Sequence, residues 1–380
     1  MPRLAFGFMT GTSCDGLDGA AIRVEGAGFD IRCQIAATAS LDFGALAAPV
    51  RDFARGGAAT AAETARLAHD LAELHAEGVR RLRAAAGDPD LVAVHGQTVF
   101  HDPPASWQLV NPWPIAAAAG CPVVSDLRGG DLASGGQGAP ITPIADWILF
   151  RHPTQTRAIV NLGGFCNITL LPAGEGLEAI QARDVCACNH VLDAAAQLAL
   201  GKPFDADGAG AASGVPDMPT AVTLQVSLLY QTQGGRSLGS ADELRDTVQH
   251  WLGPGAGQGR GGSRALSPSD ALATAATSVA ISIANRLNGL TPAPGLILLA
   301  GGSVRNRALM TALADHCRAL IATTADFGVD PQYREAAAMA ILGCLAADGA
   351  PVGLPHVTGA GQPILWQGSW TNMPPARTPG

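Results

Sequence analysis

The residues best suited to chemistry lie in one short turn near the start of the chain, between an apolar run at 4–8 and another at 20–24. Two apolar runs joined by a Gly-rich segment predict a strand, a tight turn and a returning strand. The turn residues are Gly11, Thr12, Ser13, Cys14, Asp15, Gly16, Leu17 and Asp18. Amides and hydroxyls bind phosphate oxygens and carboxylates bind hydrated Mg²⁺, so the turn suits a phosphate chain with its metal. An ordinary hairpin turn, which favours the same residue types, is the alternative.

A second polar group follows the next predicted strand. The Leu spacing over 61–86 predicts a helix that ends at Gly87, and the apolar run at 91–94 predicts a strand directly after it. His95, Gln97, Thr98 and His101 come next. Polar residues at the C-terminal end of a strand in an α/β sheet tend to face the ligand crevice. The alternative is a polar group that only caps the strand.

The segment 123–143 brings opposite charges next to a flexible turn. An apolar pair leads into Asp126, Arg128 and Asp131, and a Gly-rich stretch follows. Carboxylates and a guanidinium in this position either bind sugar hydroxyls or pair with one another in a structural contact. The residues alone leave both interpretations open.

Two later segments carry further candidate site residues. The apolar run from 295 breaks at Gly301 and Gly302 before a predicted helix at 308–319. This arrangement can admit a flat adenine or a phosphate beside the backbone, although many α/β turns share it. A predicted helix at 334–345 carries Glu335 in its first turn, where a carboxylate can also simply complement the helix dipole.

The second half of the chain begins like the first. Residues 157–171 again form an apolar run, a Gly-centred turn and an apolar run. An internal duplication would explain this, with the turn of each hairpin facing a shared cleft. Coincidence between two ordinary hairpins is the alternative.

The composition limits the classes of function. The 380 residues are 47% apolar and 15% charged, with a formal net charge of −8. This acidic balance gives no basic surface for nucleic acid and no attraction to anionic lipid. No run reaches the ~20 apolar residues of a membrane helix, and the first residues lack a signal-peptide pattern. We therefore expect a cytoplasmic protein that binds neither nucleic acid nor membrane.

The eight Cys residues are scattered along the chain, and we expect them to be reduced thiols. Cys186, Cys188 and His190 are close enough in sequence to suggest a metal site. Structural zinc usually needs a second pair of ligands, and the sequence has no second Cys pair of this kind. Small, semi-buried thiols are the favoured interpretation.

Taken together and in order, the motifs resemble those of the anhydro-N-acetylmuramic acid kinases, and the resemblance runs from Leu4 to about Gly368. The motifs are GTSCDGLD (11–18), HGQTVFHDP (95–103), SDLRGGDLASGGQGAP (125–140), NLGGFCNIT (161–169), FDADGAGAASG (204–214) and AGGSVRN (300–306). The resemblance implies an α/β fold with two RNase H-like domains, of the actin and hexokinase type, around a central nucleotide cleft. We expect the first domain at 1–140 with 348–380 and the second at 141–347.

The resemblance also implies a reaction. ATP, 1,6-anhydro-N-acetylmuramic acid and water give N-acetylmuramic acid 6-phosphate and ADP, a step in the recycling of cell-wall murein. Water attacks the anomeric carbon while O6 receives the γ-phosphoryl group. The expected ligands are the sugar, ATP and Mg²⁺, and the resemblance favours a homodimer.

By the same resemblance, the site residues form three groups. Asp184 corresponds by position to the family's catalytic base. The nucleotide-binding residues are Gly11, Thr12, Ser13, Cys14, Asp15, Gly16, Leu17, Asp18, Asn161, Gly163, Gly164, Gly301 and Gly302. The substrate-binding residues are His95, Gln97, Thr98, Arg128, Asp131 and Glu335. Asp15 or Asp18 is expected near the Mg²⁺, bound through water.

Two loops depart from the family's pattern. The family's catalytic segment reads Asp-Thr-Gly-Pro-Gly-Asn, whereas 184–189 keeps the Asp and the Asn without the Gly-Pro-Gly. The family's Pro-Lys-Ser-Thr-Gly-Arg-Glu corresponds to 235–240, where Arg236 replaces the Lys and the Arg-Glu pair is absent. The alternatives are a related kinase of another amino- or anhydro-sugar and a nucleotide-binding sensor without turnover. Retention of Asp184 and Glu335 argues against the sensor.

Overall fold

The computed structural model describes residues 2–232, 238, 242–253, 266–361 and 368–371. The chain divides into two compact units, the first made of Met1–Arg151, Gly176–Ile180 and Phe327–Gly380, the second of His152–Glu175 and Gln181–Asp326. Each unit has its own apolar core. Three segments that the sequence placed in the second domain, 141–151, 176–180 and 327–347, fall in the first unit, where the helix of the last segment packs on the sheet.

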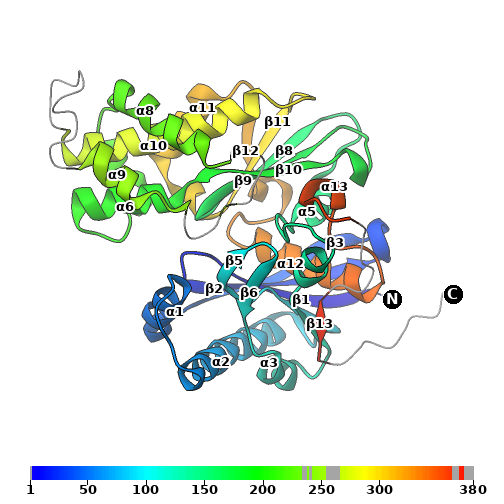
Figure 1. Cartoon of the computed structure of the whole chain (residues 1–380). Coiled ribbons are helices and arrows are strands. Elements are labelled where there is room, and N and C mark those ends of the chain that lie inside the picture. The colour runs from blue at the N-terminus through cyan, green and yellow to red at the C-terminus, as the bar shows by residue number, and fades with distance from the viewer. Residues whose placement is uncertain (1, 233–237, 239–241, 254–265, 362–367, 372–380) are drawn as a thin grey trace. The chain divides into compact units, whose positions relative to one another are not determined.

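The first unit contains a large sheet, a separate two-stranded hairpin and several helices (Figure 1). Its strands are β1 (Arg3–Thr10), β2 (Gly16–Glu25), β3 (Arg32–Asp42), β4 (Leu91–Val94), β5 (Gln97–Asp102), β6 (Ala105–Leu109), β7 (Val123–Ser125) and β13 (Ser369–Trp370). Its helices are α1 (Ala47–Ala54), α2 (Ala61–Ala86), α3 (Pro112–Ala119), α4 (Gly129–Ala133), α5 (Pro143–Phe150), α12 (Arg334–Ala347) and α13 (Pro355–Thr358).

The six-stranded sheet of this unit has the order β13-β7-β4-β1-β2-β3. Strands β1, β2 and β3 form an antiparallel meander, and β4 and β7 continue it in parallel with β1. Figure 1 shows α2 and α3 on one face of the sheet and α12 on the other. Gly7 allows α12 to approach β1, because a Cβ there would lie 2.0 Å from the carbonyl oxygen of Ala336. The sheet is therefore covered on both sides by helices.

The predicted helix at 61–86 and strand at 91–94 are confirmed as α2 and β4. Thr60 and Glu63 form a capping box at the start of α2, and Gly87 ends the helix with a φ of 104°. The predicted turn is shorter than expected, because the pairing of β1 with β2 continues to Thr10 and Leu17. Gly16, Leu17 and Asp18 therefore lie in β2, and only 11–15 form the turn.

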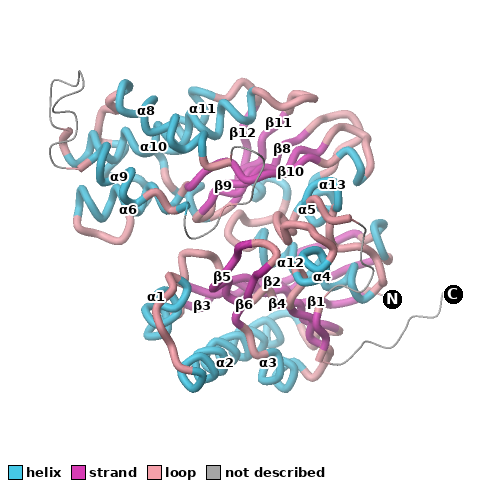
Figure 2. Tube along the Cα trace, in the orientation of Figure 1, coloured by secondary structure: helices cyan, strands magenta, loops and turns pink. Residues whose placement is uncertain are grey.

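The second unit pairs one sheet with a layer of helices. Its strands are β8 (Arg157–Leu162), β9 (Phe165–Leu171), β10 (Gln181–Ala187), β11 (Leu296–Ala300) and β12 (Leu320–Thr323). Its helices are α6 (Asn189–Leu200), α7 (Ala209–Ala212), α8 (Met218–Tyr230), α9 (Arg245–Leu252), α10 (Pro268–Asn288) and α11 (Arg307–His316). The long helix α10 is almost wholly buried and contacts α6, α7, α8 and α11 (Figure 2).

The strand order of this unit is β10-β9-β8-β11-β12. Strands β8, β9 and β10 form an antiparallel meander, and β11 and β12 continue it in parallel with β8. This order and these directions repeat those of β3-β2-β1-β4-β7 in the first unit. The prediction of an α/β fold with two RNase H-like halves is confirmed.

Two features outside these sheets bear on the earlier expectations. The helix predicted at 308–319 begins at Arg307 and ends at His316, after a short 3-10 turn at Gly302–Arg305. Among the described residues, no helix combines the length and apolarity needed to cross a lipid bilayer.

Candidate functional site

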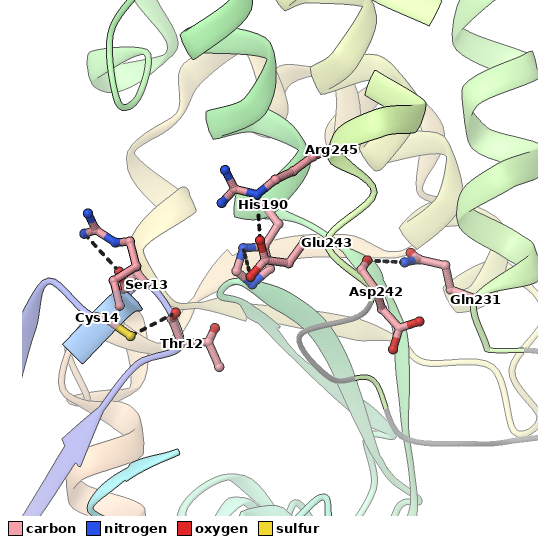
Figure 3. A network of polar contacts seen from close by, with 9 residues as sticks. Thr12, Ser13, Cys14, His190, Gln231, Asp242, Glu243 and Arg245 are labelled. Atoms are coloured by element: carbon pink, nitrogen blue, oxygen red, sulfur yellow. Dashed lines mark hydrogen bonds and ion pairs between the residues drawn. The ribbon is translucent and has the colours of Figure 1, made fainter. Parts of the chain in front are cut away.

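The turn between β1 and β2 is held by contacts with its own residues and with β5. The carbonyl oxygen of Gly11 accepts hydrogen bonds from the Cys14 amide and from Gln97 Nε2, both at 3.2 Å. Ser13 Oγ donates to Asp15 Oδ1 at 2.6 Å. Cys14 Sγ lies 3.5 Å from the carbonyl oxygen of Thr12 (Figure 3). The structure therefore joins Gln97, a predicted sugar residue, to the predicted phosphate turn.

Gln97 is fully buried, and only one of the two polar atoms of its side-chain amide forms hydrogen bonds among the described residues. Nε2 donates to the carbonyl oxygens of Gly11 and Thr98, whereas Oε1 has no hydrogen-bond partner among the described residues. A buried acceptor without a partner is costly in a folded protein unless a ligand or water fills the place. No described residue donates to this acceptor, and a donor on a water or a ligand would satisfy it.

Carboxylates of the first unit gather near the start of α12. Asp18 Oδ1 accepts a hydrogen bond from Gln332 Nε2 at 2.9 Å. Burial raises the pKa of Glu335, and the negative charges of Asp146 and Asp18 raise it further, while Arg334 and Arg128 act in the opposite direction. The raised pKa of Glu335 therefore comes mainly from burial, because the largest charge effects, those of Arg334 and Arg128, lower it.

His95 and Arg128 form a second polar network in this unit. Arg128 Nε donates to His95 Nε2 at 2.9 Å, and His95 Nδ1 lies 2.9 Å from the carbonyl oxygen of Gly96. Burial and the neighbouring Arg128 lower the pKa of His95 to about 3, so the ring is neutral near pH 7. Because Nε2 accepts from Arg128, the neutral ring carries its proton on Nδ1 and donates it to the Gly96 carbonyl oxygen. His95 thus holds the guanidinium in place.

Asp131, in α4, is hydrogen-bonded to the loop that follows and to α13. Its Oδ2 accepts from the Gly138 amide at 2.7 Å, and its Oδ1 accepts from Thr358 Oγ1 at 2.5 Å. Arg128 Nη1 donates to the carbonyl oxygen of Gly138 at 2.5 Å. Asp131 and Arg128 are therefore joined through one residue, Gly138, and not by a direct hydrogen bond or ion pair in the described structure.

In the second unit, the predicted nucleotide residues at 161–164 and 301–302 meet at the ends of β8 and β11. Gly301 has a φ of 90°, and a Cβ there would lie 2.6 Å from the carbonyl oxygen of Leu162. The same Cβ would lie 3.0 Å from Asn161 Oδ1, a buried acceptor without a partner among the described residues. Gly302 has open space around its Cβ position. A Cβ at Gly301 would therefore collide with its neighbours, whereas a Cβ at Gly302 would not.

The turn of this second hairpin also holds the start of α6. The carbonyl oxygens of Gly164 and Gly163 accept from the amides of Cys188 and Asn189 at 2.8 and 3.0 Å. Asn189 Oδ1 accepts a hydrogen bond from Ser303 Oγ. Asn189 therefore links the segment after Asp184 to the Gly301–Gly302 segment, a role that the sequence did not reveal.

Asp184 lies at a bulge in β10. The pairing of β10 with β9 shifts between Asp184 and Cys186, and bulges of this kind re-aim a side chain next to active sites. Asp184 Oδ2 accepts from the Leu238 amide at 2.8 Å. Of the altered loop at 235–240, Leu238 alone lies within the described residues. None of residues 185–188 has a positive φ, so this backbone path does not require the family's glycines.

The Cys-rich segment beside Asp184 is apolar core. Cys166, Cys186 and Cys188 are buried, and burial raises the pKa of each thiol, that of Cys188 to about 12. The rings of His190 and Phe165 pack in a tilted arrangement, with centroids 4.7 Å apart. His190 also lies 3.9 Å from Glu243, which contacts Arg245 (Figure 3). The described part of the chain contains no group of three or more His, Cys, Asp or Glu side chains arranged to hold a metal.

A three-stranded meander continued by two parallel strands, present once in each unit, defines the RNase H-like α/β class to which actin-type and hexokinase-type proteins belong. Within this class, the model of the family described as Anhydro-N-acetylmuramic acid kinase matches residues 3–371, and the chain belongs to this family.

Curated relatives are similar to this chain over nearly its whole length. Anhydro-N-acetylmuramic acid kinase of Salinibacter ruber is 36% identical, over 94% of this chain and 94% of the relative. That of Bordetella pertussis is 38% identical, over 94% and 93%. Among solved structures, component A of (R)-2-hydroxyglutaryl-CoA dehydratase from Acidaminococcus fermentans is 15% identical, covers 90% of this chain and 98% of its own, and has a TM-score of 0.43.

The contrast between Gly301 and Gly302 gives a testable pair of variants. Gly301→Ala should lower the free energy of unfolding by about 1–3 kcal/mol, because alanine disfavours the positive φ and its Cβ meets Leu162. Gly302→Ala should change it by less than about 0.5 kcal/mol. If the backbone at 302 lies against the nucleotide, Gly302→Ala should raise KM for ATP several-fold. Thermal unfolding measures the change in stability, and initial rates measure KM for ATP. An unchanged KM in Gly302→Ala would show that Gly302 does not lie at the nucleotide site.

Proposed function

We propose that this protein is an ATP-dependent kinase that hydrolytically opens 1,6-anhydro-N-acetylmuramic acid and phosphorylates O6, giving N-acetylmuramic acid 6-phosphate and ADP. The observation that carries the proposal is the family match over 3–371, within which Asp184 stands at the bulge of β10. The substrate class follows from the printed names of the relatives, which are 34–38% identical over nearly the whole chain.

In this proposal, the turn of the first unit binds the phosphates of ATP. Residues 11–15 offer backbone amides and the hydroxyls of Thr12 and Ser13, and such groups bind phosphate oxygens. Gly301 and Gly302 would lie beside the adenosine, with Asn161, Gly163 and Gly164 next to them.

The donor chemistry of the first unit also suits Mg²⁺, which keeps several waters and takes one or two carboxylates together with substrate phosphates. Asp18 is the better placed of the two predicted carboxylates, because it shares the acidic neighbourhood of Glu335, whereas Asp15 is exposed and bonded to Ser13. Bound there, the ion would neutralise phosphate charge.

Asp184 would act as the general base. It would orient one water and take its proton as the water oxygen bonds to the anomeric carbon. The bond between that carbon and O6 breaks, O6 bonds to the γ-phosphorus, and ADP leaves with the electrons of the former phosphoanhydride bond. The proton therefore ends on the Asp184 carboxylate, and the products contain every atom of ATP, sugar and water.

The sugar would contact Gln97, Thr98 and Glu335, with His95 holding Arg128. The unpartnered Oε1 of buried Gln97 is the strongest support, because a sugar hydroxyl or amide can donate to it. Asp131 would act mainly by fixing the loop around Gly138, given that both its oxygens already accept hydrogen bonds.

An ADP-release assay with three sugars tests the proposal. We expect turnover with 1,6-anhydro-N-acetylmuramic acid and a product heavier than the substrate by one phosphoryl group plus one water. N-acetylmuramic acid, which has no bridge, and glucose are the controls. Faster turnover with either control would favour a different sugar kinase, and ATP binding without turnover on any sugar would favour the sensor.

The raised pKa of Glu335 leads to a pH-dependent prediction. The folded state binds this proton more tightly than the unfolded state, so stability falls as pH rises from about the ordinary value of 4.5 through the raised value. Glutamine cannot ionise, so the Glu335→Gln variant does not lose this stability as the pH rises. The variant should therefore gain stability relative to the wild type at pH 8, and the gain should shrink towards pH 4.

Thermal unfolding at several pH values measures the Glu335 effect. Glu73→Gln, on the exposed face of α2, controls for removal of one negative charge. A Glu335→Gln difference that does not change with pH would contradict the assignment. In kinetics, Glu335→Gln should raise KM for the sugar or lower kcat while leaving KM for ATP unchanged.

We further propose a cytoplasmic location and, on the family resemblance, a homodimer. Light scattering on the purified protein tests the second point, with a mass of twice 38.5 kDa expected.

A further inference from the structure

An open cavity of about 370 Å³ with a mixed polar and apolar lining lies in the second unit, away from the residues assigned above. It is lined by the start of β10, by the C-terminal end of α10 and by Leu229 of α8. Arg183 and Arg286 contribute guanidinium groups, Gln181 and Asn285 contribute amides, and Leu229 and Leu290 form an apolar wall. The volume falls within the range of small-molecule sites.

The two guanidinium groups have no acidic partner. No Asp or Glu lines the cavity, and neither arginine takes part in an ion pair within the described residues. The undescribed stretches 233–237, 239–241, 254–265, 362–367 and 372–380 contain no Asp or Glu in their sequence. A side-chain carboxylate from those stretches therefore cannot neutralise the pair.

Arg286 forms a side-chain hydrogen bond, although no described carboxylate pairs with its charge. Its Nη2 donates to Thr232 Oγ1 at 3.4 Å, and Thr232 Oγ1 in turn donates to the carbonyl oxygen of Val185 at 3.3 Å. Burial lowers the pKa of Arg286, and the charge of Arg183 lowers it further. Two like charges face one cavity, and an anion between them would convert this repulsion into attraction.

The cavity is separate from the environment of Asp184. Successive side chains of a strand point to opposite faces, so Arg183 and Asp184 lie on opposite sides of β10. The register shift of β10 comes only after Asp184 and does not alter this alternation.

We propose that this cavity binds a small phosphate monoester through Arg183 and Arg286. A phosphate dianion matches the two positive charges, and guanidinium groups bind phosphate oxygens in a bidentate manner. The cavity has room beyond one phosphate, and the amides of Gln181 and Asn285 with the Leu229–Leu290 wall suit a small hydroxyl-bearing carbon body. This site is additional to the proposed kinase activity and does not depend on it.

Calorimetric titration with glycerol 3-phosphate at constant ionic strength tests the site, with a non-hydrolysable ATP analogue present so that the nucleotide site does not contribute. Arg183→Gln and Arg286→Gln should each weaken binding at least about tenfold, since each removes charge-assisted hydrogen bonds. Arg318→Gln, an exposed arginine of the same unit, is the matched control and should bind like the wild type.

Malonate, a dianion without phosphate, forms the second arm and should bind more weakly than glycerol 3-phosphate. Equal or tighter binding of malonate would overturn the choice of phosphate. Wild-type binding by the Arg183→Gln/Arg286→Gln double variant would overturn the site itself, as would an absence of heat in the wild type. Thermal unfolding of each variant without ligand shows that the variants are folded, and Arg286→Lys should restore part of the affinity.

Discussion

Asp184→Asn should lower kcat by about 10²–10⁴-fold, the range in which a positioned general base contributes. Asparagine has the same shape but cannot take a proton from water. Its carbonyl oxygen can still accept the hydrogen bond that the Leu238 amide donates to Asp184 Oδ2 at 2.8 Å. The local backbone should therefore be preserved while the chemistry is lost. Steady-state ADP release, with the anhydro sugar saturating, measures the effect.

The experiment separates a catalytic role from a structural one. A base assignment requires that the affinity for ATP and the melting temperature stay close to those of the wild type. If Asp184 serves only to hold the backbone at 238, turnover, ATP affinity and stability should fall together. Asp246→Asn, on an exposed aspartate in the first turn of α9, is the matched control and should keep full turnover. A near wild-type rate in Asp184→Asn would remove the assignment.

The local elements of this fold could be predicted because their signals lie close together in sequence. The helix 61–86 has its capping box, its Leu spacing and its terminal Gly87 within one segment, and the strand 91–94 follows without a gap. The repeated hairpins predicted the duplicated sheet for the same reason. The end of the first turn could not be predicted in the same way. Gly and Asp are typical of turns, yet Gly16 and Asp18 lie in strand β2, which pairs with β1.

The contacts that organise the site are long-range, and no local pattern encodes them. Gln332 reaches Asp18 across 314 residues of sequence, and Arg334 reaches Asp146 across 188. Asn189 bonded to Ser303 is a similar case, separated by 114 residues. The sequence feature that comes closest to predicting such a contact is a charged residue in an apolar segment, such as Asp146 in the mostly apolar helix α5. Such a residue indicates a buried charge, but it does not indicate which residue pairs with it.

The family's Gly-Pro-Gly between Asp184 and Asn189 is absent from this chain, and the backbone at these positions does not need glycine. Glycine is needed where φ is positive, and no residue at 185–188 has a positive φ. Strand β10 instead runs on to Ala187, and the buried thiols of Cys186 and Cys188 fill the core beneath it. The departure is therefore compatible with the position of Asp184 at the bulge of β10.

Breaking the ion pair between Arg334 and Asp146 should produce the largest loss of stability in the first unit. Arg334 Nε donates to Asp146 Oδ1 at 2.8 Å, a second contact joins Nη2 to Oδ2, and Nη2 also donates to Thr142 Oγ1 at 3.1 Å. The side chains are 1% and 0% exposed. Although burial alone would lower the pKa of Arg334, Asp146 raises it above its ordinary value. Both groups therefore stay charged in the core.

Asp146→Ala should lower the free energy of unfolding by about 3–5 kcal/mol, because it leaves a buried guanidinium without its counter-charge. Denaturant unfolding measures this loss, and Glu77→Gln is the control, since Glu77 pairs with Arg80 and Arg81 on the exposed surface of α2 and should cost at most about 1 kcal/mol. The double variant Asp146→Leu/Arg334→Met should recover much of the loss, as apolar groups need no counter-charge. A cost for Asp146→Ala no larger than that of Glu77→Gln would contradict the argument.

Because Arg334 also opposes the raised pKa of Glu335, Arg334→Met should steepen the fall of stability with rising pH, which links this buried pair to the carboxylate next to it.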